Sequence, residues 1–216
     1  MAATRCGTDN QGDVCGRIGD GDAVRIADDM NDDENWTGGF YELCLVLGAS
    51  DDATVGRVLS CLWRAADVQG CHRLRGDGTG FAAVDLGVVA LHEHGHVRGT
   101  LTLPSGARVV CGAFLSRYEG TDTLELYLPL GALTRVDRRV GGYPFDESSG
   151  VESLTWRSPL DRWLADIAIA VHGEVPFHRA LIGFEVYEDH GNNGDQRYHA
   201  ILTPSPDGMK YYPAST

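Results

Sequence analysis

The stretch Thr123-Leu124-Glu125-Leu126-Tyr127-Leu128-Pro129-Leu130-Gly131 alternates leucine with other residues without a break. This period of two is typical of a β-strand that buries one of its faces. The stretch Tyr41-Glu42-Leu43-Cys44-Leu45-Val46-Leu47-Gly48 repeats its Glu-Leu-x-Leu-x-Leu-Gly core. We therefore expect two strands whose leucine faces lie side by side in one sheet, beneath two amphipathic helices.

Two helices are predicted to cover this sheet. The first spans about 53–69, because Ser50-Asp51-Asp52 supplies capping side chains and apolar residues then recur on one stripe. The second is predicted to begin at Ser158, with Pro159 in its first turn, and to end at Gly173.

The remaining strand patterns fix the fold class. Residues 97–103 and 108–118 flank a Pro-Ser-Gly turn and predict a β-hairpin, and 180–188 and 198–203 predict a second one. Residues 81–96 fit either a strand or a buried helix. Several strands separate the two helices, so both helices cannot be crossovers between parallel strands. We predict an α+β fold, a two-layer sandwich in which a mostly antiparallel sheet of about six to seven strands packs two helices on one face.

The first 37 residues differ in composition from the rest. They hold nine acidic residues against three arginines and have no sustained periodicity, which is typical of disorder. We predict a disordered acidic tail at 1–37 followed by a single α+β domain at 38–216.

Charge and hydropathy exclude several classes of partner. A net charge of −13 argues against nucleic-acid binding. No apolar run is long enough to cross a bilayer, and no export signal opens the chain. The six cysteines form no C-x-x-C pair, so no cysteine metal site is predicted. The composition favours a cytoplasmic protein with neither nucleic-acid nor membrane partners and no cofactor, and it does not indicate an oligomeric state.

Residues 134–157 form a long connection with the densest basic cluster in the chain, followed by aromatic residues. The candidate binding residues are Arg135, Arg138, Arg139, Tyr143, Phe145 and Trp156. Arginine beside aromatics is typical of protein-interaction hot spots and of pockets for anions. We therefore predict a non-catalytic binding protein that recognises a protein partner or a small anionic ligand through 134–157. Alternatively, the aromatics close the end of the core and the arginines pair with local acids.

The stretch Leu91-His92-Glu93-His94-Gly95-His96-Val97-Arg98-Gly99 has the spacing H-E-x-x-H. It resembles the zincin metalloprotease motif over about nine residues. In a helix, His92 and His96 would lie one turn apart and bind zinc, while Glu93 would activate a metal-bound water. A zinc-dependent hydrolase is thus the first alternative function. If the segment is extended, the three histidines share one strand face and form a weaker metal site, and the third interpretation is a histidine-rich exposed loop.

Three glutamates, Glu42, Glu125 and Glu185, occupy similar positions in predicted strands, each opposite an apolar face. If these strands are neighbours, the carboxylates converge on the open face of the sheet, where they could hold a metal ion or transfer protons. A carboxylate-based metal enzyme on this face is the second alternative. The plain interpretation is a solvated face of a half-buried sheet.

Overall fold

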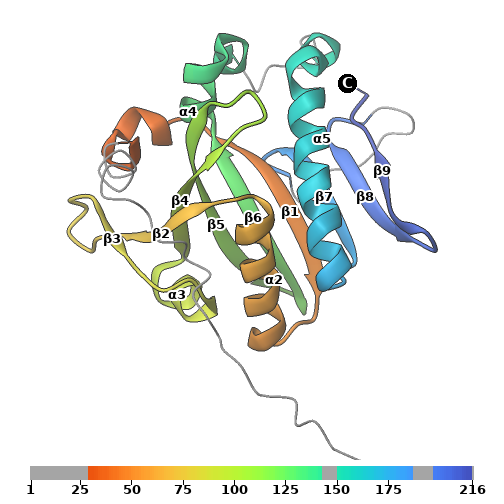
Figure 1. Ribbon diagram of the computed structural model, residues 1–216, viewed down its shortest axis with the longest axis horizontal. Coiled ribbons are helices and arrows are strands. Elements are labelled where there is room, and N and C mark those ends of the chain that lie inside the picture. The colour runs from red at the N-terminus through yellow and green to blue at the C-terminus, as the bar shows by residue number, and fades with distance from the viewer. Residues whose placement is uncertain (1–28, 143–149, 187–196, 216) are drawn as a thin grey trace, which may run out of the picture.

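The computed structural model describes residues 29–142, 150–186 and 197–215. Within them lies one antiparallel sheet with the strand order β3-β2-β4-β5-β6-β1-β7-β8-β9 (Figure 1). Its strands are β1 (Phe40–Gly48), β2 (Gln69–Leu74), β3 (Phe81–Ala83), β4 (His96–Thr102), β5 (Arg108–Tyr118), β6 (Thr121–Pro129), β7 (Arg179–Phe184), β8 (Ala200–Ser205) and β9 (Gly208–Tyr212). The helices are η1 (Asp33–Trp36), α2 (Asp52–Ala65), α3 (Val88–His94), α4 (Leu130–Val136), η2 (Arg138–Gly142) and α5 (Gly150–Glu174).

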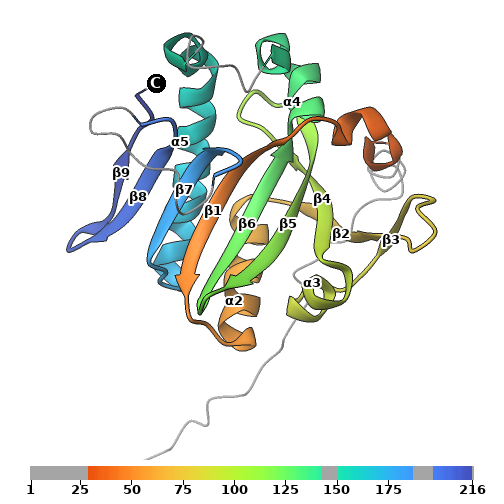
Figure 2. The same ribbon diagram turned by 180° about the vertical axis from the view of Figure 1, so that it is seen from behind.

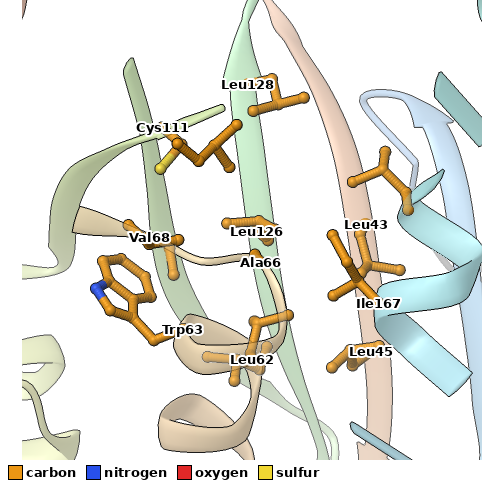
Figure 3. Packing of buried hydrophobic residues seen from close by; sticks show 14 of the residues in the cluster. Leu43, Leu45, Leu62, Trp63, Ala66, Val68, Cys111, Leu126, Leu128 and Ile167 are labelled. Atoms are coloured by element: carbon orange, nitrogen blue, oxygen red, sulfur yellow. The ribbon is translucent and has the colours of Figure 1, made fainter. Parts of the chain in front are cut away.

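The predicted pairing of the two leucine-rich strands is confirmed. β1 and β6 are neighbours, with Leu43 opposite Leu126 and Leu45 opposite Leu124. All four side chains are fully buried. Helices α2 and α5 cover this face of the sheet, and Figure 3 shows Leu62 of α2 near Leu45 and Leu126. The core is therefore the layer between the two helices and the central strands.

The N-terminus of α5 differs from the prediction. The helix begins at Gly150, so Pro159 lies inside it and Ser158 is not its cap. A proline removes one backbone hydrogen bond from a helix and does not have to end it when packing holds the preceding turn. That turn is held here, because Arg157 is buried and its Nε donates to Ser153 Oγ over 2.7 Å.

The described sheet has nine strands, more than the six to seven expected. The additional strands are short and lie at its two edges, where β3 has three residues and β9 has five. Residues 81–96 divide between β3 and α3, and much of the predicted loop at 134–157 is helical. The coarser prediction, an α+β fold built on a large antiparallel sheet, is confirmed, whereas the described residues also form the short helices α3 and α4 beside the two that were expected.

The folded part begins before the predicted boundary at residue 38. Met30 is 1% exposed, and the Trp36 indole donates to its backbone carbonyl over 2.8 Å. Met30 belongs to the hydrophobic core and Trp36 packs against it, and these contacts hold residues 30–36 against the rest of the fold. The remainder of the predicted tail, 1–28, lies outside the described residues.

The sheet face opposite α2 and α5 carries no long helix in the described ranges. Figure 2 shows no helix lying across β1, β6 and β5 on this side, with η1 in front of the sheet near β4. We call it the open face. None of the described helices is both long and apolar enough to span a membrane.

Candidate functional site

Two of the three candidate arginines in 134–157 pair with local acids. Arg135 on α4 contacts Asp32 at 2.6 Å and Glu34 at 2.9 Å. Arg139 on η2 contacts Asp137 at 2.6 Å. These pairs lie at the surface, and those of Arg135 join α4 to the 32–36 segment, so both guanidinium groups are already engaged within the chain.

The other candidates in this region divide between core and surface. Trp156 is 9% exposed, and its ring centroid lies 5.9 Å from that of Tyr41. Arg138 is exposed. Tyr143 and Phe145 lie outside the described residues. Trp156 therefore closes one end of the core, as the alternative interpretation of 134–157 holds.

The histidine motif does not form one helix. α3 ends at His94, Gly95 follows with φ +73°, and β4 begins at His96. His92 and Glu93 are exposed on α3. Neither the helical geometry of the zinc hypothesis nor a shared strand face for the three histidines is present. Among the described residues, no group of three or more His, Cys, Asp or Glu is placed to hold a metal ion.

The predicted glutamates do approach one another on the open face. Glu42 on β1 is 4% exposed and Glu125 on β6 is 7% exposed. Burial and, to a smaller extent, the charges of Glu125 and Glu185 together raise the pKa of Glu42 to about 8, against a hydrogen bond from the Val186 N–H. Burial also raises the pKa of Glu125 to about 7, against a hydrogen bond from the Thr123 hydroxyl. Two carboxyl groups on neighbouring strands are thus held partly protonated near neutral pH.

Strand register extends this polar cluster across the open face. His72, Arg98, Gly112, Tyr127 and Glu42 are successive partners on β2, β4, β5, β6 and β1. A side chain at Gly112 would collide with the Tyr127 hydroxyl, so the glycine gives the phenol room to lie over β5. Burial raises the pKa of Tyr127 to about 12, although the charge of Arg98 lowers it.

Four polar atoms on this face lack a hydrogen-bond partner among the described residues. They are Nδ1 of His72, Nδ1 of His96, Nε of Arg98 and Oγ1 of Thr100, all buried on β2 and β4. Burial also lowers the pKa values of both histidines. A buried donor or acceptor without a partner costs about 1–3 kcal/mol, so such a group in a folded protein calls for an explanation. Their concentration on two adjacent strands marks this part of the open face as a candidate ligand site.

A cavity of about 540 Å³ lies at this end of the face. The Arg98 guanidinium lies over two aromatic rings, with its carbon 5.1 Å from the Trp36 centroid and 5.4 Å from the Phe81 centroid. Leu74 adds an apolar wall, and Asn31, Asp33 and Thr79 supply polar atoms. We call this cavity the Arg98 pocket.

Three segments that are distant in sequence build the Arg98 pocket. η1 contributes Trp36, the β2–β3 hairpin contributes Phe81, and β4 contributes Arg98. The hairpin approaches the segment before η1 so closely that a side chain on Gly80 would lie 2.8 Å from Asn31 Oδ1. The φ of +94° at Gly80 also favours glycine. This pocket was not predicted from the sequence.

Comparison of the chain with protein-family models, curated proteins and solved structures gave no match.

Proposed function

We propose that this protein is a non-catalytic binding protein that takes up a small organic anion in the Arg98 pocket. The observation that carries the proposal is the partly buried Arg98, whose buried Nε has no hydrogen-bond partner among the described residues and whose side chain lines a cavity of about 540 Å³. Pockets of 300–1,000 Å³ with apolar walls and a few polar groups are typical of small-molecule sites.

The charge of Arg98 selects the anionic group. The planar guanidinium presents a fork of donors that matches a carboxylate or phosphate in two parallel hydrogen bonds. An anion at this position would satisfy the Nε donor and be attracted by the cation in a partly dehydrated site. These gains oppose the entropic cost of association.

The walls select the rest of the ligand. Trp36, Phe81 and Leu74 offer flat or apolar surface beside the guanidinium. The carboxylate of Asp33 at the same pocket disfavours a second negative group. The ligand that fits these features has one anionic group and a planar apolar body, as an aromatic carboxylate has.

Titration with benzoate tests the proposal, with benzylamine as the ligand of opposite charge. The Trp36 indole N–H reports on the pocket by NMR. Benzoate should shift it in a saturable manner and benzylamine should not, and Arg98→Gln should abolish the shift. Leu74→Glu places a negative charge at an exposed pocket wall and should weaken benzoate binding without disturbing the core.

Arg138→Gln is the matched control, because Arg138 is exposed on η2 and belongs to the region that the sequence indicates. Retained benzoate binding in this variant supports the Arg98 pocket. Loss of binding in Arg138→Gln with retention in Arg98→Gln would place the anion at 134–157. The absence of any saturable benzoate shift would refute the proposal. Recognition of a protein partner by 134–157, and a cytoplasmic location, stay predictions.

A further inference from the structure

Two opposite charges, Arg98 and Asp33, line the same cavity. Arg98 is partly buried on β4, and Asp33 is exposed on η1. Neither side chain forms an ion pair in the ranges that the structure describes. By contrast, the acids on either side of Asp33, Asp32 and Glu34, both pair with Arg135. The Arg98 pocket therefore presents both a cation and an anion that a ligand can use.

Two neutral acceptors line the cavity together with Asp33. The Thr79 hydroxyl donates its proton to Asp77 Oδ1 over 2.7 Å, so only its lone pairs are left for a ligand. The carbonyl oxygen of Asn31 lies beside Gly80, where an added Cβ would come within 2.8 Å of it. Because Gly80 follows Thr79 directly, these two acceptors lie close together. We call the side chains of Asn31, Asp33 and Thr79 the acceptor group.

An α-amino acid matches both sets of partners. Its carboxylate would accept the parallel hydrogen bonds that the guanidinium of Arg98 offers. Its ammonium group has three N–H donors and no acceptor, so it suits the acceptor group and is repelled by the guanidinium. The rings of Trp36 and Phe81, which also line the cavity, favour a planar apolar side chain on the ligand.

We propose that the Arg98 pocket binds a free aromatic α-amino acid, with its carboxylate on Arg98 and its ammonium at the acceptor group. This inference rests on the proposed function, because the carboxylate remains the anchor in the more buried part of the pocket. It adds a selectivity that Arg98 alone does not give. Without Asp33, an ammonium group on the ligand would only weaken binding, since it would meet a like charge.

Phenylalanine and 3-phenylpropanoate test the inference, because the two ligands differ only in the ammonium group. The Trp36 indole N–H reports the affinity of each by NMR titration. Phenylalanine should bind about fivefold more tightly, because a charged hydrogen bond strengthens binding and the exposure of Asp33 limits the gain. In Asp33→Asn this preference should be lost or reversed. The same variant should bind 3-phenylpropanoate at least as tightly as the wild type does, since a negative charge has been removed.

Glu34→Gln is the matched control. It removes the same charge from η1, but Glu34 pairs with Arg135 and is not among the residues that line the cavity. This variant should keep the preference for phenylalanine. Thr79→Val is a second test in case Asp33→Asn does not fold. It removes one acceptor at an exposed position and should weaken the binding of phenylalanine but not of 3-phenylpropanoate.

The outcomes separate this inference from the proposed function. If the wild type binds 3-phenylpropanoate as tightly as phenylalanine, the inference is overturned and the anion site stands. An unchanged preference in both Asp33→Asn and Thr79→Val would also overturn it, as would an equal loss of preference in Glu34→Gln and Asp33→Asn. If neither ligand gives a saturable shift, the proposed function fails together with the inference.

Discussion

Removing the Tyr41 hydroxyl tests a buried polar network between α5 and the sheet. Asp161 and Arg157 on α5 are each 1% exposed, and the Tyr41 hydroxyl on β1 donates to Asp161 Oδ1. Hydrogen bonds to charged groups contribute about 1.5–3 kcal/mol. We therefore expect Tyr41→Phe to lower the free energy of unfolding by about 2 kcal/mol at pH 7.5, which for a chain of this size corresponds to a fall in Tm of about 4–8 °C.

The effect of Tyr41→Phe should depend on pH. Burial raises the pKa of Asp161 to about 6, although the hydrogen bond from Tyr41 and the charge of Arg157 lower it. Because the folded pKa is raised, the contribution of Asp161 to stability is complete below its unfolded pKa, near 3.8, and is lost as pH rises through about 6. At pH 5 the carboxyl is mostly protonated in the folded state, and the lost bond is a neutral one of about 1 kcal/mol. The destabilisation should thus be smaller at pH 5 than at pH 7.5.

Urea unfolding of the wild type and the variant at both pH values measures this difference. Tyr118→Phe is the matched control, because Tyr118 is 72% exposed on β5; it should change stability by less than about 0.5 kcal/mol. A loss in Tyr41→Phe that is equal at the two pH values, or no larger than in the control, would refute the assignment of Asp161 as an ionised buried acceptor.

Three further predictions follow from glycine positions and from the histidine motif. Gly112→Ala should destabilise the fold by about 1–3 kcal/mol in urea unfolding, because the new methyl group meets the Tyr127 hydroxyl. Gly56→Ala on α2, where the added methyl meets open space, should stabilise the protein by about 0.5–1 kcal/mol, and a loss of stability there would contradict the packing. Added zinc should leave the Tm unchanged, and His92→Ala and His96→Ala should not alter that response, because α3 ends between the two histidines.

Local sequence patterns were sufficient to predict the central strands of the sheet and the start of α2. The strict alternation of leucine indicates which face of β1 and of β6 packs against the helices, and the shared Glu-Leu-x-Leu-x-Leu-Gly core predicted that the two strands pair. The start of α2 could also be predicted from neighbouring residues, because the Asp51 side chain accepts a hydrogen bond from the Thr54 N–H only three residues later. Local signals misplaced the start of α5, because Ser158-Pro159 has the composition of a helix start. The burial of Arg157 and Trp156, which extends the helix toward residue 150, depends on tertiary contacts.

The difference between local sequence patterns and tertiary contacts also explains which candidate-site residues could be predicted from the sequence. Glu42 and Glu125 were found because each lies within a strand whose alternation is visible, and their proximity follows once the strands pair. The Arg98 pocket could not be predicted in this way, because it forms only where Arg98 meets Trp36 and Phe81. These two aromatic residues lie in segments that are distant from β4 in the sequence. β4 does carry a signal, because polar His96, Arg98 and Thr100 alternate with the residues that face the helices.

That signal on β4 has a physical interpretation that can be applied to other sheets. An antiparallel sheet with one face toward solvent places polar side chains there, and most of them reach water. Polar side chains that are buried on such a face without partners are different, because each one costs stability unless something else satisfies it. On β4 the side chain of Arg98, whose buried Nε has no hydrogen-bond partner among the described residues, lines a cavity. A ligand in that cavity would satisfy the donor and stabilise the fold by mass action. A rise in Tm with benzoate that Arg98→Gln abolishes would therefore link the unsatisfied donor to the binding role, and an equal rise in the variant would separate them.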